Sequence, residues 1–261
     1  MSTLLVTYNE AVKGLKLTWD YKFNLLMLGI MNSIVFVGIS FFIGQGELNA
    51  DLMTPALLGY LVWFFAVTVI FDMNTNLAQE AQTGTLEQLY MSPVSSSFIF
   101  IGRTIATLIT GSLMMVLIGV GLGQALGLSI PMNWQGIAVI GVTIFGLLGF
   151  GFMIGGATLL FKQVSPLANL LQNILLFLNG ALLPIHLMPD WLAAVAKTLP
   201  TTQGIVVLRS VVLDGASLAD VWRNNSLIWL IVHSATYLLA GWLIFKVCET
   251  AAKKQGTLGK Y

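Results

Sequence analysis

The chain has 261 residues, of which 57% are hydrophobic and only 9% are charged. This composition, with a mean hydropathy of +0.87, excludes an ordinary soluble globular domain and indicates a protein embedded in a lipid bilayer. The net charge of +1 gives no basic face that would neutralise phosphates, which excludes a nucleic-acid partner.

Residues 1–24 form a polar leader with an amphipathic pattern. Apolar residues recur at spacings of three and four, whereas Glu10 and Lys13 fall on the other side, which is typical of an amphipathic helix. Trp19 and the lysines suit the headgroup region of a bilayer. We therefore expect an interface helix along the inner membrane surface; the alternative is an extended first span.

Six later stretches are apolar enough to cross a membrane, which takes about 20 residues. They are Leu25–Ile43, Pro55–Phe71, Phe98–Leu126, Trp134–Phe161, Leu167–Leu183 and Leu227–Val247. The sequence therefore predicts an all-α membrane protein with six transmembrane helices in a single domain, residues 1–261. Because the number of spans is even, both termini are expected on the same side.

The distribution of lysine and arginine predicts on which side of the membrane the two termini lie. Three of the twelve lie in the long connection after span five, where charge has little influence on topology. The other nine share one face: Lys13, Lys16, Lys22, Arg103, Lys162, Lys246, Lys253, Lys254 and Lys260. This asymmetry predicts a multi-pass cell-membrane protein whose termini are both cytoplasmic.

The connection between spans two and three, residues 80–93, reads EAQTGTLEQLYMSP. Gly84 offers a turn, Thr85 a helix cap and Pro93 a stop, so we expect a helix of two turns at most. Its apolar face is formed by Leu86, Leu89 and Tyr90, which leaves Glu80, Glu87 and Gln88 for water or a partner. A short amphipathic helix held between two spans on the cytoplasmic side indicates a docking surface.

Spans three and four are rich in glycine. Pairs four residues apart, such as Gly119 with Gly123 and Gly151 with Gly155, let helix backbones approach closely. We expect a tight helical bundle there. The glycine pattern does not identify a ligand site.

Span five carries four amide side chains within an arc of about 120 degrees, at about 100 degrees per residue. They are Asn169, Gln172, Asn173 and Asn179. Amides on a spanning helix must face protein or water, so either interhelical hydrogen bonding or the lining of a pathway accounts for them. Span two adds an aromatic stripe, which is either packing or a ligand surface, formed by Tyr60, Trp63, Phe64 and Phe71.

Residues 184–213, between spans five and six, contain two apolar runs that are each too short to cross a membrane. Irregular backbone at membrane depth is tolerated only where protein or a watery cavity covers it. We therefore predict a re-entrant extracytoplasmic helical hairpin that dips into the outer leaflet.

The chain offers little catalytic chemistry. It has one cysteine and two histidines, His186 and His233, and no H-E-x-x-H, CxxC or Walker A pattern. His233 is either a functional group or a side chain satisfied by its neighbours. The inventory predicts no metal site, no cofactor and no nucleotide site on this chain, and no enzymatic activity of its own.

The segment from Glu80 to Pro93 resembles the E-x-x-x-G-T-L-E-x-L-x-x-[ST]-P segment of type 2 ABC exporter permeases, the six-span membrane subunits of ATP-driven exporters. A second segment of that family is similar to the stretch LPTTQGIVVLRSVVLDG, in which Arg209 occupies the position of the family's arginine. The resemblance covers almost the whole chain.

The resemblance implies that residues 80–93 contain a coupling helix, which sits in a cleft of an ATPase subunit. The matching residues are Glu80, Gly84, Thr85, Leu86, Glu87, Leu89 and Pro93, with Gln88 in the same helix. Many relatives have a basic and an acidic residue where this chain has Ala81 and Gln82. We therefore expect apolar insertion of Leu86 and Leu89, with Glu87 as the polar contact.

The resemblance also implies the assembly. Two ABC ATPase subunits, which bind ATP and Mg, would drive a pair of permeases, either a homodimer or a heterodimer, surrounded by membrane lipid. Spans two and five would line the pathway of a hydrophobic or amphipathic cargo such as a drug, a lipid or a small peptide. The alternative is a membrane scaffold or regulator that binds an ATPase without transporting anything.

Overall fold

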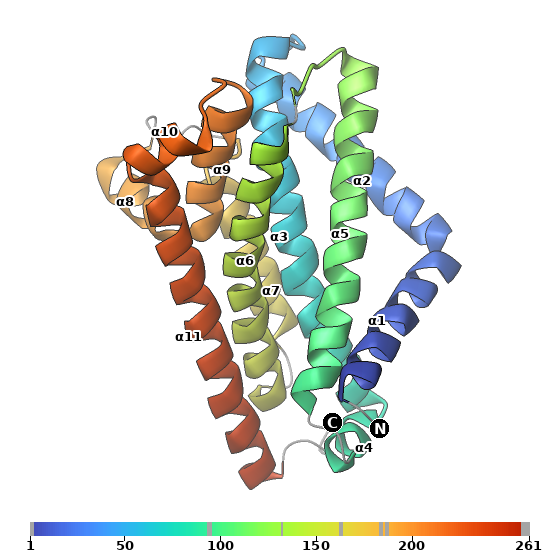
Figure 1. The fold of residues 1–261 in the computed structure, drawn as a ribbon. Helices are drawn as coiled ribbons and strands as arrows, with labels where there is room; N and C mark the ends of the chain where they lie inside the picture. The colour runs from blue at the N-terminus through green and yellow to red at the C-terminus, as the bar shows by residue number, and fades with distance from the viewer. Residues whose placement is uncertain are drawn as a thin grey trace.

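The computed structural model describes residues 3–92, 96–131, 133–161, 164–182, 185 and 188–256, with the side chain of Ser97 excepted. Within these ranges the regular structure is α-helical, and no strand occurs (Figure 1). The helices are α1 (Thr3–Asp20), α2 (Lys22–Ile43), α3 (Ala50–Gln82), α4 (Thr85–Met91), α5 (Ser96–Leu126), α6 (Trp134–Leu160), α7 (Ser165–Leu178), α8 (Asp190–Thr198), α9 (Pro200–Val212), α10 (Leu218–Arg223) and α11 (Ser226–Gln255).

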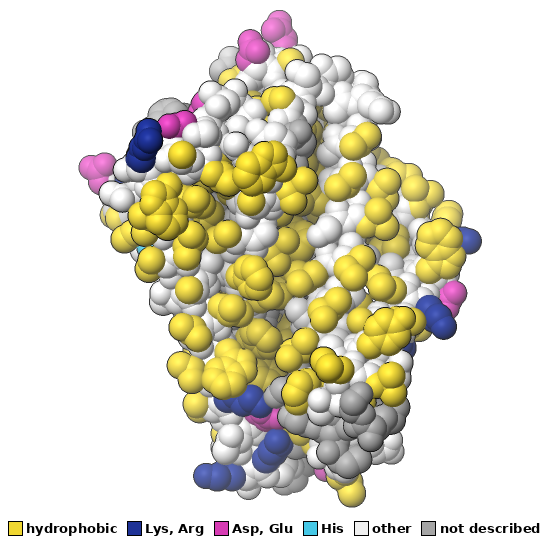
Figure 2. Space-filling model, in the orientation of Figure 1, with side chains coloured by type: hydrophobic (Ala, Val, Ile, Leu, Met, Phe, Trp, Pro, Cys, Tyr) yellow, Lys and Arg dark blue, Asp and Glu magenta, His cyan; other side chains and the backbone are white. Residues whose placement is uncertain are grey.

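In the described part of the chain, five helices are long and apolar enough to cross a membrane: α2, α3, α5, α6 and α11. They have 22 to 33 residues, and at about 1.5 Å per residue each reaches the roughly 30 Å of a hydrocarbon core. Spans one, two, three, four and six of the prediction therefore coincide with long helices. Figure 2 shows hydrophobic side chains spread over one long side of the molecule, with charged groups mainly at its ends and edges, as a multi-pass membrane protein requires.

Span five is shorter than predicted. Helix α7 has 14 residues, or about 21 Å, and ends at Leu178 rather than Leu183. Asn179 follows the helix as its C-terminal cap, and Gly180 adopts a φ of +74°, a left-handed conformation that stops it. In Figure 1, α7 rises from the end of the molecule that holds α4, and α8 and α9 occupy the opposite half. The six-span layout therefore stays a prediction.

Within the range predicted as a hairpin the structure describes two short helices, α8 and α9, that meet at Leu199 and Pro200. Pro200 starts α9 because its missing N–H needs no partner in a first helical turn. Much of α9 is buried against α3, α6 and α11. The predicted segment begins at Pro184, which lies outside the described residues, and its depth in a membrane stays a prediction.

Helix α3 is the centre of the bundle, and the largest hydrophobic cluster forms around its buried residues, including Leu57, Tyr60 and Phe65. Helices α6 and α11 pack closely against each other. A side chain added at Gly149 would collide with the backbone of Tyr237, and one at Gly241 would collide with the backbone of Gly149. The tight packing expected from the glycines of span four is thus confirmed at this contact.

The leader is a helix separate from the first span, since α1 ends at Asp20 and α2 begins at Lys22. The two helices meet at an angle in Figure 1. Helix α1 packs along α5, where an added side chain at Gly14 would meet Ala106. This geometry excludes a straight extended first span. Helix α1 begins, and α11 ends, at the end of the molecule that holds α4.

Candidate functional site

Helix α4 leaves α3 through a sharp turn at Gly84, whose φ is +73°. Glycine adopts this left-handed conformation without the steric cost that a Cβ atom brings. Thr85 is the first residue of α4 rather than its cap, and its hydroxyl donates to the Glu80 carbonyl at 3.3 Å. Pro93, the predicted stop, lies outside the described residues, and α4 ends at Met91.

Leu86 anchors α4 to its own chain. Its side chain is only 2% exposed and packs in a cluster with residues of α3, α5, α6 and α11. The expected insertion of Leu86 into a partner is therefore corrected: this side chain is already occupied by the bundle. The exposed residues of α4 include Glu87, Gln88 and Met91, which is 84% exposed.

The other apolar residues of α4, Leu89 and Tyr90, are half-buried and pack against the same cluster. The ammonium nitrogen of Lys253 lies 4.6 Å from the centre of the Tyr90 ring, a cation–π distance. Burial, together with the nearby Glu249 carboxylate, raises the pKa of the Tyr90 phenol, so this group stays neutral. Helix α4 is thus tied to the end of α11.

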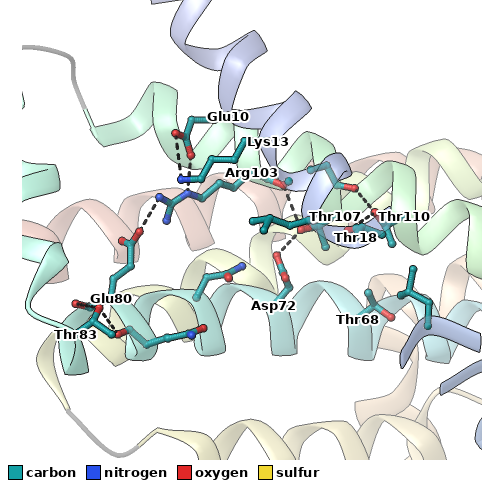
Figure 3. Close-up of a pocket in the computed structure, with 16 residues that line it drawn as sticks. Glu10, Lys13, Thr18, Thr68, Asp72, Glu80, Thr83, Arg103, Thr107 and Thr110 are labelled. Atoms are coloured by element: carbon teal, nitrogen blue, oxygen red, sulfur yellow. Dashed lines mark hydrogen bonds and ion pairs between the residues drawn. The ribbon is translucent and has the colours of Figure 1, made fainter. Parts of the chain in front are cut away.

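Arg103 of α5 joins three helices (Figure 3). Its Nη2 lies 2.7 Å from Glu80 Oε1 of α3, and its Nε donates to Glu10 Oε2 of α1 at 3.0 Å. All three side chains are only about one-fifth exposed. Glu80 was expected to be left for water or a partner, but its carboxylate binds Arg103 instead.

The sequence did not predict this ion-pair cluster, because Arg103 was considered only as one of the positive charges that indicate the cytoplasmic side. A signal was present, because an arginine inside an apolar span must find a counter-charge or reach water. The sequence does not say which of the carboxylates nearby in the fold supplies it.

A second polar cluster surrounds Glu249 of α11, whose side chain is almost fully buried. Its carboxylate accepts a hydrogen bond from the Ser96 hydroxyl at 2.7 Å and binds Lys246 at 2.9 Å and Lys253 at 3.1 Å. The cluster therefore fixes the start of α5 to the last turns of α11, next to α4.

The aromatic residues of span two do not share one environment. Tyr60 is fully buried and donates from its hydroxyl to the Asn32 carbonyl at 2.9 Å, and Phe64 is also buried. Trp63 donates from its indole N–H to the Gln172 carbonyl of α7 at 2.9 Å. Phe71 points outward. Tyr60 and Phe64 thus pack inside this chain, which corresponds to the packing interpretation of the stripe.

The four amides of span five do not share one surface. Asn179 lies beyond the helix, is fully buried, and accepts a hydrogen bond from the Ala181 N–H at 2.9 Å. Gln172 is half-buried, whereas Asn169 and Asn173 are exposed on α7. Exposed apolar residues such as Phe177 lie on the same helix. This face of α7 therefore combines amides and apolar groups, and no helix in the described part of the chain covers it.

Two further polar links hold α7 and α9 in place. Asn74 of α3 donates to the Ser165 hydroxyl at 3.2 Å and accepts from Thr158 of α6 at 2.9 Å. Arg209 of α9 donates to the Pro55 carbonyl at 2.7 and 3.0 Å and to the Ala181 carbonyl at 3.0 Å. Arg209 thus joins α9 to the start of α3.

The histidines and acidic residues form no metal centre in the described ranges, where no group of three or more His, Cys, Asp or Glu side chains is placed to hold an ion. Nδ1 of His233 lies 2.9 Å from the Trp229 carbonyl, so a backbone group of its own helix satisfies it. His186 lies outside the described residues.

The chain is similar to known transporter proteins. The family model described as "ABC-2 type transporter" matches residues 10–213. The probable multidrug ABC transporter permease YbhR of Escherichia coli is 26% identical over 200 residues, which are 74% of this chain and 52% of that protein. The inner membrane transport permease YhhJ of Escherichia coli is 26% identical over 174 residues, 61% of this chain and 46% of that protein. The chain spans about half the length of the curated relatives that it matches.

Proposed function

The chain belongs to the ABC-2 type transporter family, and from this premise we propose that it is the permease subunit of an ATP-driven exporter, with α4 as its coupling helix. The observation that carries the proposal is the construction of α4. A left-handed glycine turn projects the helix, Leu86 fixes it to the bundle, and Glu87 and Gln88 remain exposed for a partner.

The partner in this proposal is an ABC ATPase subunit, present in two copies and carrying the ATP and Mg. ATP favours the closed ATPase pair, because a ligand shifts an equilibrium only through its different affinity for the two states. Closure would displace α4. The contacts of Leu86, the Glu80–Arg103 ion pair and the Tyr90–Lys253 contact would carry that displacement to α3, α5, α1 and α11.

The exposed face of α7 supports a second permease copy, in a homodimer or a heterodimer. Asn169 and Asn173 would be costly against lipid and need a polar partner or a watery pathway. We place the pathway between the α3 and α7 helices of the two copies. With α8 and α9 as the re-entrant hairpin and α7 as span five, the layout has six spans, and both termini are cytoplasmic.

The cargo in this proposal is hydrophobic or amphipathic, such as a drug, a lipid or a small peptide, and it moves out of the cytoplasm. The name of the relative YbhR, a probable multidrug permease, supports this class. The apolar character of α3 and α7 supports it as well.

The experiment is Glu87→Arg in the full chain, reconstituted in proteoliposomes with the ATPase that copurifies with it. We expect normal membrane insertion and a loss of ATP-driven export, because the charge of the docking face is reversed. The matched control is Glu47→Arg, an exposed carboxylate in the connection between α2 and α3 at the opposite end of the molecule. Unaltered export by Glu87→Arg would remove the coupling role. ATPase binding without any cargo movement by the wild-type chain would favour the scaffold alternative.

A further inference from the structure

A polar cavity of about 510 Å³ lies between α1, α3 and α5. Figure 3 shows the order of its side chains: the ion pairs of Arg103 lie at one end, Asp72 and Thr107 lie in the middle, and Thr18, Thr68 and Thr110 lie at the other end. The cavity is therefore charged near α4 and rich in hydroxyl groups farther along the bundle.

The charges in the cavity are not balanced, because its lining has three carboxylates and two cations. Arg103 and Lys13 both bind Glu10, and Arg103 also binds Glu80. Asp72 accepts a hydrogen bond from Thr107 and forms no ion pair with any lysine or arginine that the structure describes. Asp72 is thus a carboxylate without an ion-pair partner among the described residues, and such a group is costly to bury unless protonation, water or a ligand balances its charge.

An apolar groove of about 660 Å³ lies next to the cavity, between α2 and α5. Leu25 lines both spaces, and the groove runs from there along α2 to Gly38. These residues span about 20 Å at the rise of an α-helix. Helix α2 buries the smallest share of its apolar window among the five long helices, so the groove opens to lipid.

We propose that the cavity and the groove together bind a single-chain amphiphile with a protonated amine headgroup. The ammonium binds the Asp72 carboxylate and donates to the nearby threonine hydroxyls, while the alkyl chain lies in the groove between α2 and α5. An anionic headgroup would meet the excess of carboxylates, and a neutral one would leave Asp72 without a cation. The identity of this ligand as exported cargo rests on the proposed function, whereas its binding does not.

The test measures binding of radiolabelled dodecylammonium to the full chain in phosphatidylcholine nanodiscs, without any ATPase, after subtraction of empty nanodiscs. Unlabelled dodecanol and dodecyl sulfate serve as neutral and anionic competitors with the same chain. We expect saturable binding that dodecyl sulfate does not displace. Asp72→Asn should weaken dodecylammonium binding about tenfold or more and leave dodecanol binding unchanged.

Two variants complete the design. Asp51→Asn, on the same helix but outside the cavity, should leave binding unchanged. Gly38→Leu should weaken binding of both the amine and the alcohol, because a side chain there enters the groove and its Cβ meets no atom within 4 Å. If Asp72→Asn does not fold, the relative binding of the amine, the alcohol and the sulfate to the wild-type chain still tests the proposal. The effect of Gly38→Leu tests it as well.

Wild-type affinity in Asp72→Asn, or equal displacement by dodecyl sulfate, would overturn the inference. Displacement of the probe by phosphatidylethanolamine added to the nanodisc would also overturn it, since the occupant would then be a membrane lipid. If the wild-type chain binds the amine but shows no ATP-driven export, the result would contradict the proposed function alone. Intact export without amine binding would contradict this inference alone.

Discussion

Arg103 Nη2 lies 2.7 Å from Glu80 Oε1, so an arginine inside one long helix binds the carboxylate that precedes the α4 turn on another. Glu10 of α1 binds the same guanidinium. The turn into α4 is therefore connected by one side chain to both α5 and α1, two of the helices that line the cavity.

Removing Arg103 should destabilise the protein, because two partly buried carboxylates lose their counter-charge. We expect Arg103→Gln to lower the free energy of unfolding by about 1–3 kcal/mol, and Glu80→Gln with Arg103→Gln to show non-additive losses. Denaturant titration of the purified chain measures both. Lys13→Gln is the control, since Lys13 is exposed and lies 3.9 Å from Glu10. Additive losses would mean that the pair is not coupled.

Leu86→Ala should leave a cavity beneath α4. A buried leucine shortened to alanine costs about 2–5 kcal/mol, and here the loss falls on the cluster that fixes α4 to the bundle. Thermal unfolding in detergent measures the loss. Met91→Ala, on the same helix but exposed, should change stability by less than about 0.5 kcal/mol. Equal effects of the two variants would show that Leu86 is not a core residue.

Gly84→Ala should strain the turn that projects α4. No neighbouring atom lies within 4 Å of the added Cβ, so the cost comes from its φ of +73° and amounts to about 1–2 kcal/mol. Gly121→Ala, also in open space but without a positive φ, should not destabilise the chain. Thermal unfolding compares them, and a neutral Gly84→Ala would exclude the left-handed turn.

Gly149→Ala should separate α6 from α11. The new methyl group would meet the backbone of Tyr237, which does not move as a flexible side chain does, so we expect a loss of at least about 1–3 kcal/mol. Gly141→Ala places the same methyl group on α6 in open space and is the matched control. Similar unfolding temperatures of the two variants would contradict the close α6–α11 contact.

The long helices were predictable from the sequence because continuous apolar runs have few alternatives in a bilayer. The shorter α7 was not predicted, since Asn179 was counted as part of a helical face although it caps the helix and binds the Ala181 N–H. Local apolar character continues past this point, and the helix ends through the Asn179 cap and the left-handed backbone of Gly180.

The site was predictable in outline only. The position of α4 and its exposed Glu87 and Gln88 agree with the sequence analysis, but amphipathicity alone does not say which partner covers an apolar face. Leu86 is covered by the protein itself. Likewise, Glu80 and Arg103 are far apart in the span assignment, and their contact depends on how α3 packs against α5.

The most direct test of the coupling role is photo-cross-linking to the copurifying ATPase from single cysteines in α4 that carry a thiol-attached benzophenone, in a Cys248→Ser background where the chain has no other cysteine. Glu87→Cys and Gln88→Cys should each form a cross-link that depends on the presence of the ATPase, whereas Leu86→Cys should not, because its side chain is buried. Cross-links from Leu86→Cys but none from the two exposed positions would contradict the account of α4 as a coupling helix anchored through Leu86.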